Sequence, residues 1–403
     1  MGESIVVISM GGIGHFQVLV PLIAGFRSRG LAVYVLTDRD LRGRVEELGA
    51  SFVDLYSARP IESADASSIP VPSRYVSFAG VFAESLADEV AGLSPRLIVY
   101  DTFTVAGQVV ARRLGIPYVN VCANHAPVPA RMLAALARDS RVATSPECWA
   151  AIERLREVHG MRDANPFSYY EALSPYLNLY CEPEEFLDER DRAPFEPLAF
   201  SGGLLPSPPR PGATDGLFPR ARQGRRVYVS FGTVVWWYFE AAATAALTAI
   251  SRTLADEEVD VLISLGRHRL SPEARAGLER PNVRVEEYVD QMAALEAADV
   301  FVTHHGINST HESLFHEVPM ISYPFFGDQP ALARRCQELE LAVALTDEPQ
   351  GPVEPGRLLA SLDRLGDESA RFAERLSEAR EWELRTIAGR GEIFDRMLAF
   401  RPR

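Results

Sequence analysis

The 403-residue sequence lacks the paired cysteines that a disulfide framework or a structural zinc site requires. Its four cysteines, Cys122, Cys148, Cys181 and Cys336, are scattered and form no CxxC pair. Isolated thiols of this kind are typical of small core residues in a reducing compartment. The sequence therefore predicts a cytoplasmic protein without disulfide bonds.

Long apolar runs and basic runs are lacking as well. No apolar segment approaches the ~18 residues that a membrane-spanning helix needs, and the first residues lack the basic region and cleavage site of a signal peptide. With 41 basic against 55 acidic residues, the formal net charge is −14, which disfavours binding to phosphate-rich polymers. We expect no nucleic-acid partner and no membrane partner. Monomer and homodimer both stay open.

What the sequence does have is a regular alternation of short β-rich runs with amphipathic stretches. Continuous apolar strands that alternate with helices indicate an α/β fold with parallel sheets. The expected strands of the first half are Ile5–Met10, Leu31–Thr37, Arg96–Tyr100, Pro117–Cys122 and Tyr176–Tyr180. Those of the second half are Val227–Phe231, Val259–Leu265, Val283–Glu287, Val300–Thr303, Met320–Tyr323 and Leu341–Leu345.

A proline-rich segment interrupts this alternation. Five prolines and three glycines lie between Leu205 and Gly224, a composition typical of a linker. We therefore expect two doubly wound, Rossmann-like domains, at residues 1–205 and 225–380, joined by a linker at 206–224, with a final helix at 381–403. Because ligands bind outside the carboxyl ends of the strands in such sheets, the residues that follow each strand are the candidates for a site.

A glycine-rich loop follows the first strand, with the sequence Gly11-Gly12-Ile13-Gly14-His15. Gly12 and Gly14 fit the dinucleotide fingerprint G-x-G-x-x-G, but Gln17 occupies the third glycine position. An NAD(P)-dependent oxidoreductase therefore stays open. His15 instead stands at the start of a helix, where the positive helix terminus favours the neutral imidazole that can act as a base.

Asp101 directly follows the apolar strand that ends at Tyr100, and so belongs to the same sheet edge as His15. A carboxylate that orients a histidine and stabilises its protonated form makes the histidine a better base. The alternatives are a capping or solvent-facing His15, and an Asp101 that caps the helix from Thr104. We predict that the two form a catalytic pair.

The segment from Val302 to Thr310 follows a strand and opens a helix in the second half. Gly306, Asn308, Ser309 and Thr310 supply free N–H groups and side-chain donors at a helix N-terminus, which favours a bound diphosphate. An ordinary N-cap explains Ser309 but not the neighbouring His304 and Gly306. The pattern predicts an anion-binding loop.

A metal site is not predicted, although four histidines crowd this region. His311 and His316 are five residues apart, which places them about 140° apart around a helix, so they cannot share a face as in a zinc protease. The string Asp38-Arg39-Asp40 lies after the second strand, away from the anion-binding loop. We interpret it as a helix cap.

Residues Tyr288 to Gln329 resemble the donor-binding signature of family 1 glycosyltransferases, which use nucleotide sugars and have the GT-B fold. The Gly12–His15 loop and the Ser230-Phe231-Gly232-Thr233 segment match two further motifs of the family. The closest type is the bacterial enzymes that modify macrolides and other natural products. The signature comprises Tyr288-Val289-Asp290-Gln291, then Thr303-His304-His305-Gly306-Ile307-Asn308-Ser309-Thr310-His311-Glu312, then Val318-Pro319-Met320, then Asp328-Gln329.

The resemblance implies two domains that face each other across a cleft, with a C-terminal helix that crosses back to the first domain. It implies an inverting, metal-independent transfer of a hexose from a UDP-sugar, or secondly a dTDP-sugar, to a small natural-product acceptor such as an antibiotic. No cofactor is expected. His15 would be the base and Asp101 would steady it. A sugar-nucleotide epimerase and a non-catalytic nucleotide-sugar-binding protein stay open.

The resemblance also assigns individual roles in donor binding. His304 and the Gly306–Ser309 loop would hold the diphosphate, and Glu312 the ribose hydroxyls. Tyr288 stands where a Trp usually stacks on the base, and Asp290 where a Pro is usual. Asp328 and Gln329 would bind the sugar. The donor-binding residues are Gly14, Ser230, Gly232, Thr233, Tyr288, Val289, Gln291, His304, Gly306, Asn308, Ser309, Thr310, Glu312, Asp328 and Gln329.

Aromatic residues outside the signature are candidates for the acceptor site. An aromatic wall suits a ring-rich or apolar acceptor, although each of these side chains could equally be part of a core. The candidates are Tyr75, Phe78, Phe103 and Trp236.

Overall fold

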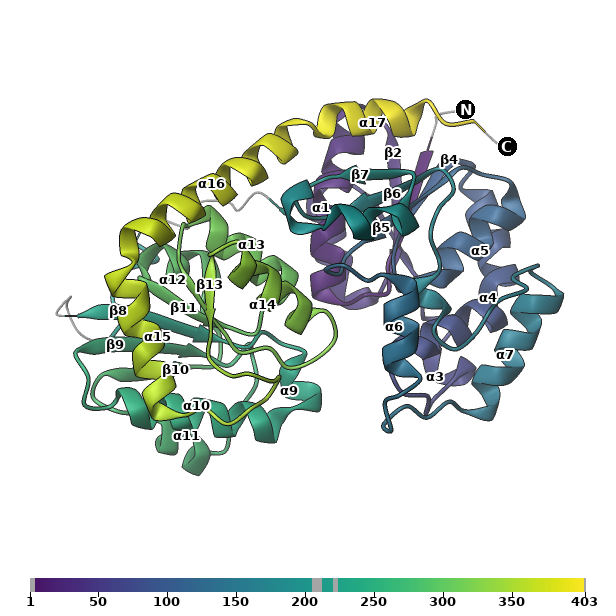
Figure 1. Ribbon diagram of the computed structural model, residues 1–403. Helices are drawn as coiled ribbons and strands as arrows, with labels where there is room; N and C mark the ends of the chain where they lie inside the picture. The colour runs from purple at the N-terminus through teal and green to yellow at the C-terminus, as the bar shows by residue number, and fades with distance from the viewer. Residues whose placement is uncertain (1–3, 205–211, 220–223, 402–403) are drawn as a thin grey trace. The chain divides into compact units, whose positions relative to one another are not determined.

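The computed structural model describes residues 4–204, 212–219 and 224–401. The chain forms two compact units (Figure 1). The first unit comprises Met1–Leu204 and Thr386–Arg403, and the second comprises Leu205–Arg385. Much of the predicted linker, residues 206–211 and 220–223, lies outside the described residues. The predicted cleft between the domains stays a prediction.

The first unit is built on a seven-stranded parallel sheet of order β3-β2-β1-β4-β5-β6-β7. The order reverses beside β1, whose Ile8 pairs with Leu36 of β2 on one side and with Tyr100 of β4 on the other. Every residue of β1 is buried, which explains its continuous apolar sequence. The strands are β1 Ser4–Ile8, β2 Ala32–Thr37, β3 Ser51–Asp54, β4 Pro95–Asp101, β5 Tyr118–Cys122, β6 Leu177–Tyr180 and β7 Leu198–Phe200.

Helices cover this sheet, and α4 packs against both α5 and α7 in one layer (Figure 1). The helices of the first unit are α1 Ile13–Ser28, α2 Arg42–Glu47, α3 Ile61–Ala64, α4 Pro72–Gly92, α5 Val105–Leu114, α6 Pro129–Leu136, α7 Pro146–Glu157, α8 Glu189–Arg192 and α17 Arg390–Leu398. Short 3-10 helices span Arg39–Leu41, Ser168–Tyr170, Glu184–Phe186 and Ala193–Phe195.

The second unit has a six-stranded parallel sheet of order β10-β9-β8-β11-β12-β13. Figure 1 shows α10 and α11 on one face of this sheet and α12 and α13 on the other. The strands are β8 Arg225–Ser230, β9 Val259–Ser264, β10 Val283–Glu286, β11 Val300–Thr303, β12 Met320–Ser322 and β13 Ala342–Ala344. The helices are α9 Val235–Tyr238, α10 Glu240–Leu254, α11 Pro272–Leu278, α12 Gln291–Ala297, α13 Ile307–Phe315, α14 Gln329–Glu338, α15 Pro355–Asp367 and α16 Ser369–Ala388.

The doubly wound α/β class is confirmed, and each predicted strand coincides with an observed one to within two residues at either end. Two short edge strands, β3 and β7, were not predicted from the sequence. The terminal helix differs too. It begins at Ser369 rather than near Glu381, and it is interrupted at Gly389, a residue type that weakens a helix. Within the described ranges, none of the helices combines the length and apolar character that a membrane crossing demands.

Helix α17 returns to the first unit and packs on α1. The Phe394 ring makes an edge contact with Phe26 at 5.0 Å between centroids. Gly25 makes room for it, because a Cβ there would lie only 2.0 Å from Phe394 Cζ. Arg390 donates hydrogen bonds to the carbonyl groups of Ser201 and Gly203. The last helix is therefore an integral part of the first unit.

Gly25→Ala should destabilise the first unit by about 1–3 kcal/mol, because the added methyl group must displace the Phe394 ring. Urea-induced unfolding would measure this. The matched control is Gly43→Ala, since a Cβ at Gly43 in α2 meets nothing within 4 Å. If Gly25→Ala were as stable as Gly43→Ala, the tight packing of α17 on α1 would be contradicted.

Candidate active site

His15 and Asp101 meet at the carboxyl edge of the first sheet. Asp101 ends β4, and His15 lies in the first turn of α1, which begins soon after β1. Because β1 and β4 are parallel neighbours, both residues are carried to the same edge. His15 Nδ1 lies 3.3 Å from Asp101 Oδ1. Among the described residues, His15 Nδ1 makes no hydrogen bond of normal geometry. The two side chains are therefore close enough for electrostatic attraction, but no hydrogen bond fixes the orientation of the ring.

Asp101 is completely buried, yet three groups donate hydrogen bonds to its carboxylate. Its Oδ2 accepts hydrogen bonds from Met10 N at 3.0 Å and Thr104 Oγ1 at 2.8 Å, and its Oδ1 from Phe103 N at 3.1 Å. Burial raises the pKa of Asp101, but His15 and these donors outweigh that effect, so the pKa lies below its usual value. Asp101 is thus a carboxylate that faces His15. Its bond goes to the Thr104 hydroxyl and not to a backbone N–H of α5, whose N-cap is Thr104 without a side-chain capping bond, so the alternative that Asp101 caps this helix is wrong.

Aromatic side chains adjoin the histidine. The Phe103 ring lies 4.7 Å from the His15 ring and 5.2 Å from that of Tyr169, measured between centroids. Among the predicted acceptor residues, Phe103 and Tyr75 are half-buried, whereas Phe78 lies in the core of the first unit. Trp236 belongs to the second unit, where it is buried and stacks on His268. Phe103 is therefore the acceptor candidate in direct contact with His15.

In the second unit, His304 is enclosed by two glycines from neighbouring loops. β8 and β11 are parallel partners, so Gly232 after β8 and Gly306 after β11 reach the same edge. A Cβ would lie 2.7 Å from His304 Nε2 at Gly232 and 2.5 Å from it at Gly306. Only glycine leaves room for the imidazole at these two positions. This explains why the two glycines accompany the histidine in the sequence.

His304 is buried, and burial lowers its pKa to about 4, against an opposing contact with the Ser230 backbone. At neutral pH the imidazole is therefore uncharged and can donate one hydrogen bond. Its Nδ1 has no hydrogen-bond partner of normal geometry within the part of the chain that the structure describes. Next to it, Gly306, Asn308 and Ser309 are half-buried at the N-terminus of α13. A helix terminus beside an uncharged imidazole donor is an arrangement that can accept an anion, so diphosphate binding here stays a prediction.

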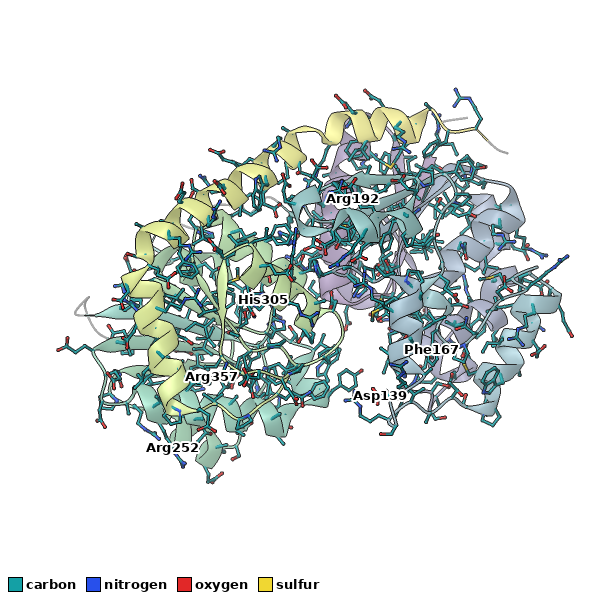
Figure 2. The ribbon with its side chains drawn as sticks, in the orientation of Figure 1. Asp139, Phe167, Arg192, Arg252, His305 and Arg357 are labelled. Carbon is teal, nitrogen blue, oxygen red and sulfur yellow. The ribbon has the colours of Figure 1, made fainter. Side chains whose placement is uncertain are left out.

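His305, which Figure 2 labels, lies in this loop, and the hydrogen bonds of its ring hold the loop in place. The backbone of His305 adopts the left-handed conformation, with φ of 59°. Its buried ring makes hydrogen bonds with Thr310 Oγ1 at 3.2 Å and with Ser322 Oγ at 2.8 Å. Thr310 is also fully buried. The structure therefore gives the Thr310 side chain, which the sequence assigned to donor binding, an internal partner instead. The structural role of His305 could not be read from the motif.

Gln291, Ser309 and Glu312 form one hydrogen-bonded cluster. Gln291 Nε2 donates to Ser309 Oγ at 3.0 Å and to Glu312 Oε2, and Tyr228 donates to Gln291 Oε1 at 3.2 Å. Burial raises the pKa of Glu312 to about 7, although the hydrogen bond from Gln291 opposes the shift. The structure thus brings Gln291 to Ser309 and Glu312, which are neighbours on α13 but lie 18 and 21 residues from it in the sequence. A carboxyl group with a pKa near 7 can accept or donate a hydrogen bond to a ligand hydroxyl.

The segment before α12 explains one departure from the family motif. Asp290, where a proline is usual, caps α12 by accepting from Met292 N at 3.1 Å. Tyr288, where a Trp is usual, is exposed, and the Arg267 guanidinium lies 4.7 Å from its ring centroid. Val289 between them is buried. An exposed ring at this strand end is available for stacking.

The two residues predicted to bind the sugar sit at the start of α14. Gln329 is buried, and its Oε1 accepts hydrogen bonds from Phe325 N at 2.9 Å and Phe326 N at 3.3 Å. The carbonyl group of Gln329 therefore holds the loop after β12, and only its amide NH₂ is left for a ligand. Asp328 is half-buried at the helix N-cap.

The remaining predicted residues also lie at the two sheet edges. Gly14 is in the first turn of α1, and Thr233 is half-buried between β8 and α9. Ser230 is buried and its Oγ accepts from Gly232 N at 3.4 Å. Asp38 caps the 3-10 helix Arg39–Leu41 by accepting from Asp40 N, as the helix-cap interpretation predicted.

Sequence reasoning missed the buried pair of His311 and Glu383. These side chains are in contact and join α13, which carries the anion-binding loop, to α16. The spacing of 72 residues hides any such partnership in the sequence.

Comparison with known proteins identifies relatives of this arrangement. Residues 194–348 match the family described as UDP-glucoronosyl and UDP-glucosyl transferase. The uncharacterized UDP-glucosyltransferase YdhE of Bacillus subtilis is 25% identical over 371 residues, which cover 86% of each chain. The NDP-glycosyltransferase YjiC of Bacillus licheniformis is 25% identical over 356 residues, or 83% of each chain.

Solved structures agree in fold. The glycotransferase of kitacinnamycin has 25% identity and a TM-score of 0.77, with 98% of this chain and all of that chain covered. The spinosyn rhamnosyltransferase SpnG, solved with thymidine diphosphate, has 17% identity and a TM-score of 0.66, with 97% and 100% covered. These likenesses confirm the predicted resemblance to nucleotide-sugar glycosyltransferases with the GT-B fold. They favour neither the oxidoreductase nor the epimerase.

The raised pKa of Glu312 has a measurable consequence for stability. The folded protein keeps this proton up to a pH of about 7, whereas an ordinary glutamate loses it near 4.5. The stability that this proton uptake provides is therefore complete below pH 4.5 and is lost as the pH rises to 7. Between these values the wild type should lose about 2 kcal/mol relative to Glu312→Gln, a figure discounted because the side chain is only partly buried.

Urea unfolding of both proteins across pH 4.5–7 would measure the difference. Exposed Glu296 on α12 offers the matched control Glu296→Gln. A constant difference between wild type and Glu312→Gln over this range would contradict the shift.

Proposed function

We propose that this chain, a glycosyltransferase enzyme with the GT-B fold and a nucleotide-sugar donor, transfers a hexose to a small acceptor by direct displacement. The proposed donor is a UDP-sugar, with a dTDP-sugar as the second candidate. The proposed acceptor is a natural product of the kind that bacterial antibiotic glycosyltransferases modify. A single displacement inverts the anomeric centre.

The observation that carries the mechanism is the pair of His15 and buried, ionised Asp101, 3.3 Å apart. With Nδ1 facing the carboxylate, the other ring nitrogen, Nε2, is the one that takes the proton of an acceptor hydroxyl. That oxygen forms a bond to the anomeric carbon as the bond to the nucleotide diphosphate breaks. Asp101 stabilises the imidazolium that results, as in other histidine–carboxylate bases.

On the donor side, the proposed roles follow the geometry of the second unit. The N-terminus of α13, with Gly306, Asn308 and Ser309, binds the diphosphate and the charge that develops on it as it leaves. The buried neutral His304 donates one further hydrogen bond. Glu312, held by Gln291, takes the ribose hydroxyls, Tyr288 stacks on the base, and Asp328 and Gln329 hold the sugar. In this proposal the fixed N–H groups replace a metal.

Nucleotide binding gives the first test. UDP or dTDP should raise the melting temperature equally with and without EDTA, because a ligand that binds only the folded state stabilises it. The UDP arm follows the Bacillus relatives, and the dTDP arm the structure of SpnG. GDP and NAD serve as controls. Stabilisation by NAD alone would overturn the transferase mechanism, and a requirement for a divalent cation would overturn the metal-independent one.

Removal of the base gives the second test. His15→Ala should lower kcat for transfer by about 10²–10⁴-fold, the usual contribution of a positioned base, while the affinity for UDP or dTDP stays unchanged. Asp101→Asn should lose activity in the same direction, because the amide cannot stabilise the imidazolium. His159→Ala, which changes a half-buried histidine just after α7 of the first unit, is the control. Transfer by His15→Ala at the wild-type rate would refute the assignment.

A further inference from the structure

Three consecutive basic residues follow β9 at the carboxyl edge of the second sheet, namely Arg267, His268 and Arg269. Two of them have carboxylate partners. His268 Nε2 lies 3.2 Å from Glu240 Oε1, and Arg269 Nε lies 3.2 Å from Glu287 Oε2. In the ranges that the structure describes, Arg267 pairs with no carboxylate, and its guanidinium lies over an aromatic ring instead.

The backbone of this loop is held in an unusual conformation. Gly266 and Arg267 are both left-handed, with φ of 58° and 74°. Arg267 N donates a hydrogen bond to the carbonyl group of Glu287 at 2.6 Å, which ties the loop to the end of β10. The left-handed conformation is ordinary for glycine but costs free energy for arginine. An arginine at such a position therefore indicates that its side chain has a use.

The loop also contacts the segments that are proposed to bind the donor. A Cβ at Gly266 would lie only 2.3 Å from the carbonyl oxygen of Gly232, so the two loops are packed directly on each other. Gly232 in turn encloses His304. The ring beneath the Arg267 guanidinium is that of Tyr288, which is proposed to stack on the base. Arg267 therefore lies between the proposed diphosphate loop and the proposed base platform.

The contact between Arg267 and Tyr288 leaves part of the ring open. The guanidinium carbon lies 4.7 Å from the ring centroid, yet Tyr288 is still 59% exposed. A planar ring has two faces, and a guanidinium that stacks on one leaves the other for a ligand. An exposed ring loses rotational freedom when a base stacks on it, and a ring already held by a guanidinium loses less.

We propose that Arg267 is a positioning residue for the nucleobase of the donor. Its guanidinium stacks on one face of Tyr288 and holds the ring so that a pyrimidine base stacks on the other face. The proposal rests on the proposed transferase function and adds a residue that acts through Tyr288. A tyrosine ring offers less stacking surface than the usual tryptophan, and Arg267 compensates for this by fixing its orientation. Arg267 takes no part in the transfer step.

Calorimetric titration with UDP and dTDP gives the first test. Arg267→Met should weaken binding of the nucleotide about two- to fivefold, the equivalent of one exposed cation–π contact. Arg267→Lys should keep part of the affinity, because an ammonium group also binds an aromatic face. The matched control is Arg252→Met, which removes an exposed arginine from the last turn of α10. Equal affinity of Arg267→Met and the wild type would overturn the proposal.

A double-mutant cycle tests whether Arg267 acts through the ring. In the Tyr288→Leu background, Arg267→Met should cause no further loss of affinity. Uridine and UDP, or thymidine and dTDP, should lose affinity by the same factor in Arg267→Met, because each pair shares its base. An undiminished effect in the Tyr288→Leu background would overturn the proposal. So would a loss confined to the diphosphates and abolished by salt, since Arg267 would then bind phosphate directly.

Arg267→Gly separates binding from stability. Glycine is favoured in the left-handed conformation, so the melting temperature without ligand should be no lower than that of the wild type, while UDP or dTDP binds more weakly. A lower melting temperature in this variant would make Arg267 a structural residue and would overturn the proposal. Failure of the wild type to bind either UDP or dTDP would instead overturn the proposed function, and with it this role of Arg267.

Discussion

Parallel pairing of strands is the constraint on which the rest of this structure depends. When all strands of a sheet run the same way, their carboxyl ends lie at one edge, and the loops that follow them are neighbours whatever their distance in sequence. His15 and Asp101 meet because β1 and β4 pair in this way, and His304 meets Gly232 because β8 and β11 do. The same arrangement appears in both units, with different side chains at the edge.

The two edges use burial in opposite ways. Asp101 is completely buried and still ionised, because His15 and three nearby donors compensate for the loss of water. Glu312 has fewer compensating donors, and burial raises its pKa to about 7. The first arrangement suits a permanent charge that stabilises a histidine as it takes a proton. The second suits a group that exchanges hydrogen bonds with neutral hydroxyls.

Backbone geometry decides where charge can be bound in the second unit. Gly232 and Gly306 let two loops close on His304, and the left-handed His305, held by Thr310 and Ser322, turns the chain into α13. A buried contact between His311 and Glu383 joins this helix to α16. The helix terminus that is proposed to bind the diphosphate is thus held by contacts within the protein, and donors positioned in advance are the condition for electrostatic stabilisation of a leaving group.

The sequence by itself determined the α/β class, the interior strands and the residues at their carboxyl ends, because apolar runs and glycine-rich turns are local signals. It also carried the motif spacing that resembles nucleotide-sugar glycosyltransferases. Only the tertiary structure decided which candidate side chains are buried in the protein interior, as Thr310 and Phe78 are. It alone also decided which side chains distant in sequence come into contact, as His311 and Glu383 do. Edge strands and the true start of α16 were likewise missed, since short or highly charged segments lack a strong hydrophobic period. Burial and long-range contact depend on packing between elements, and no local pattern records them.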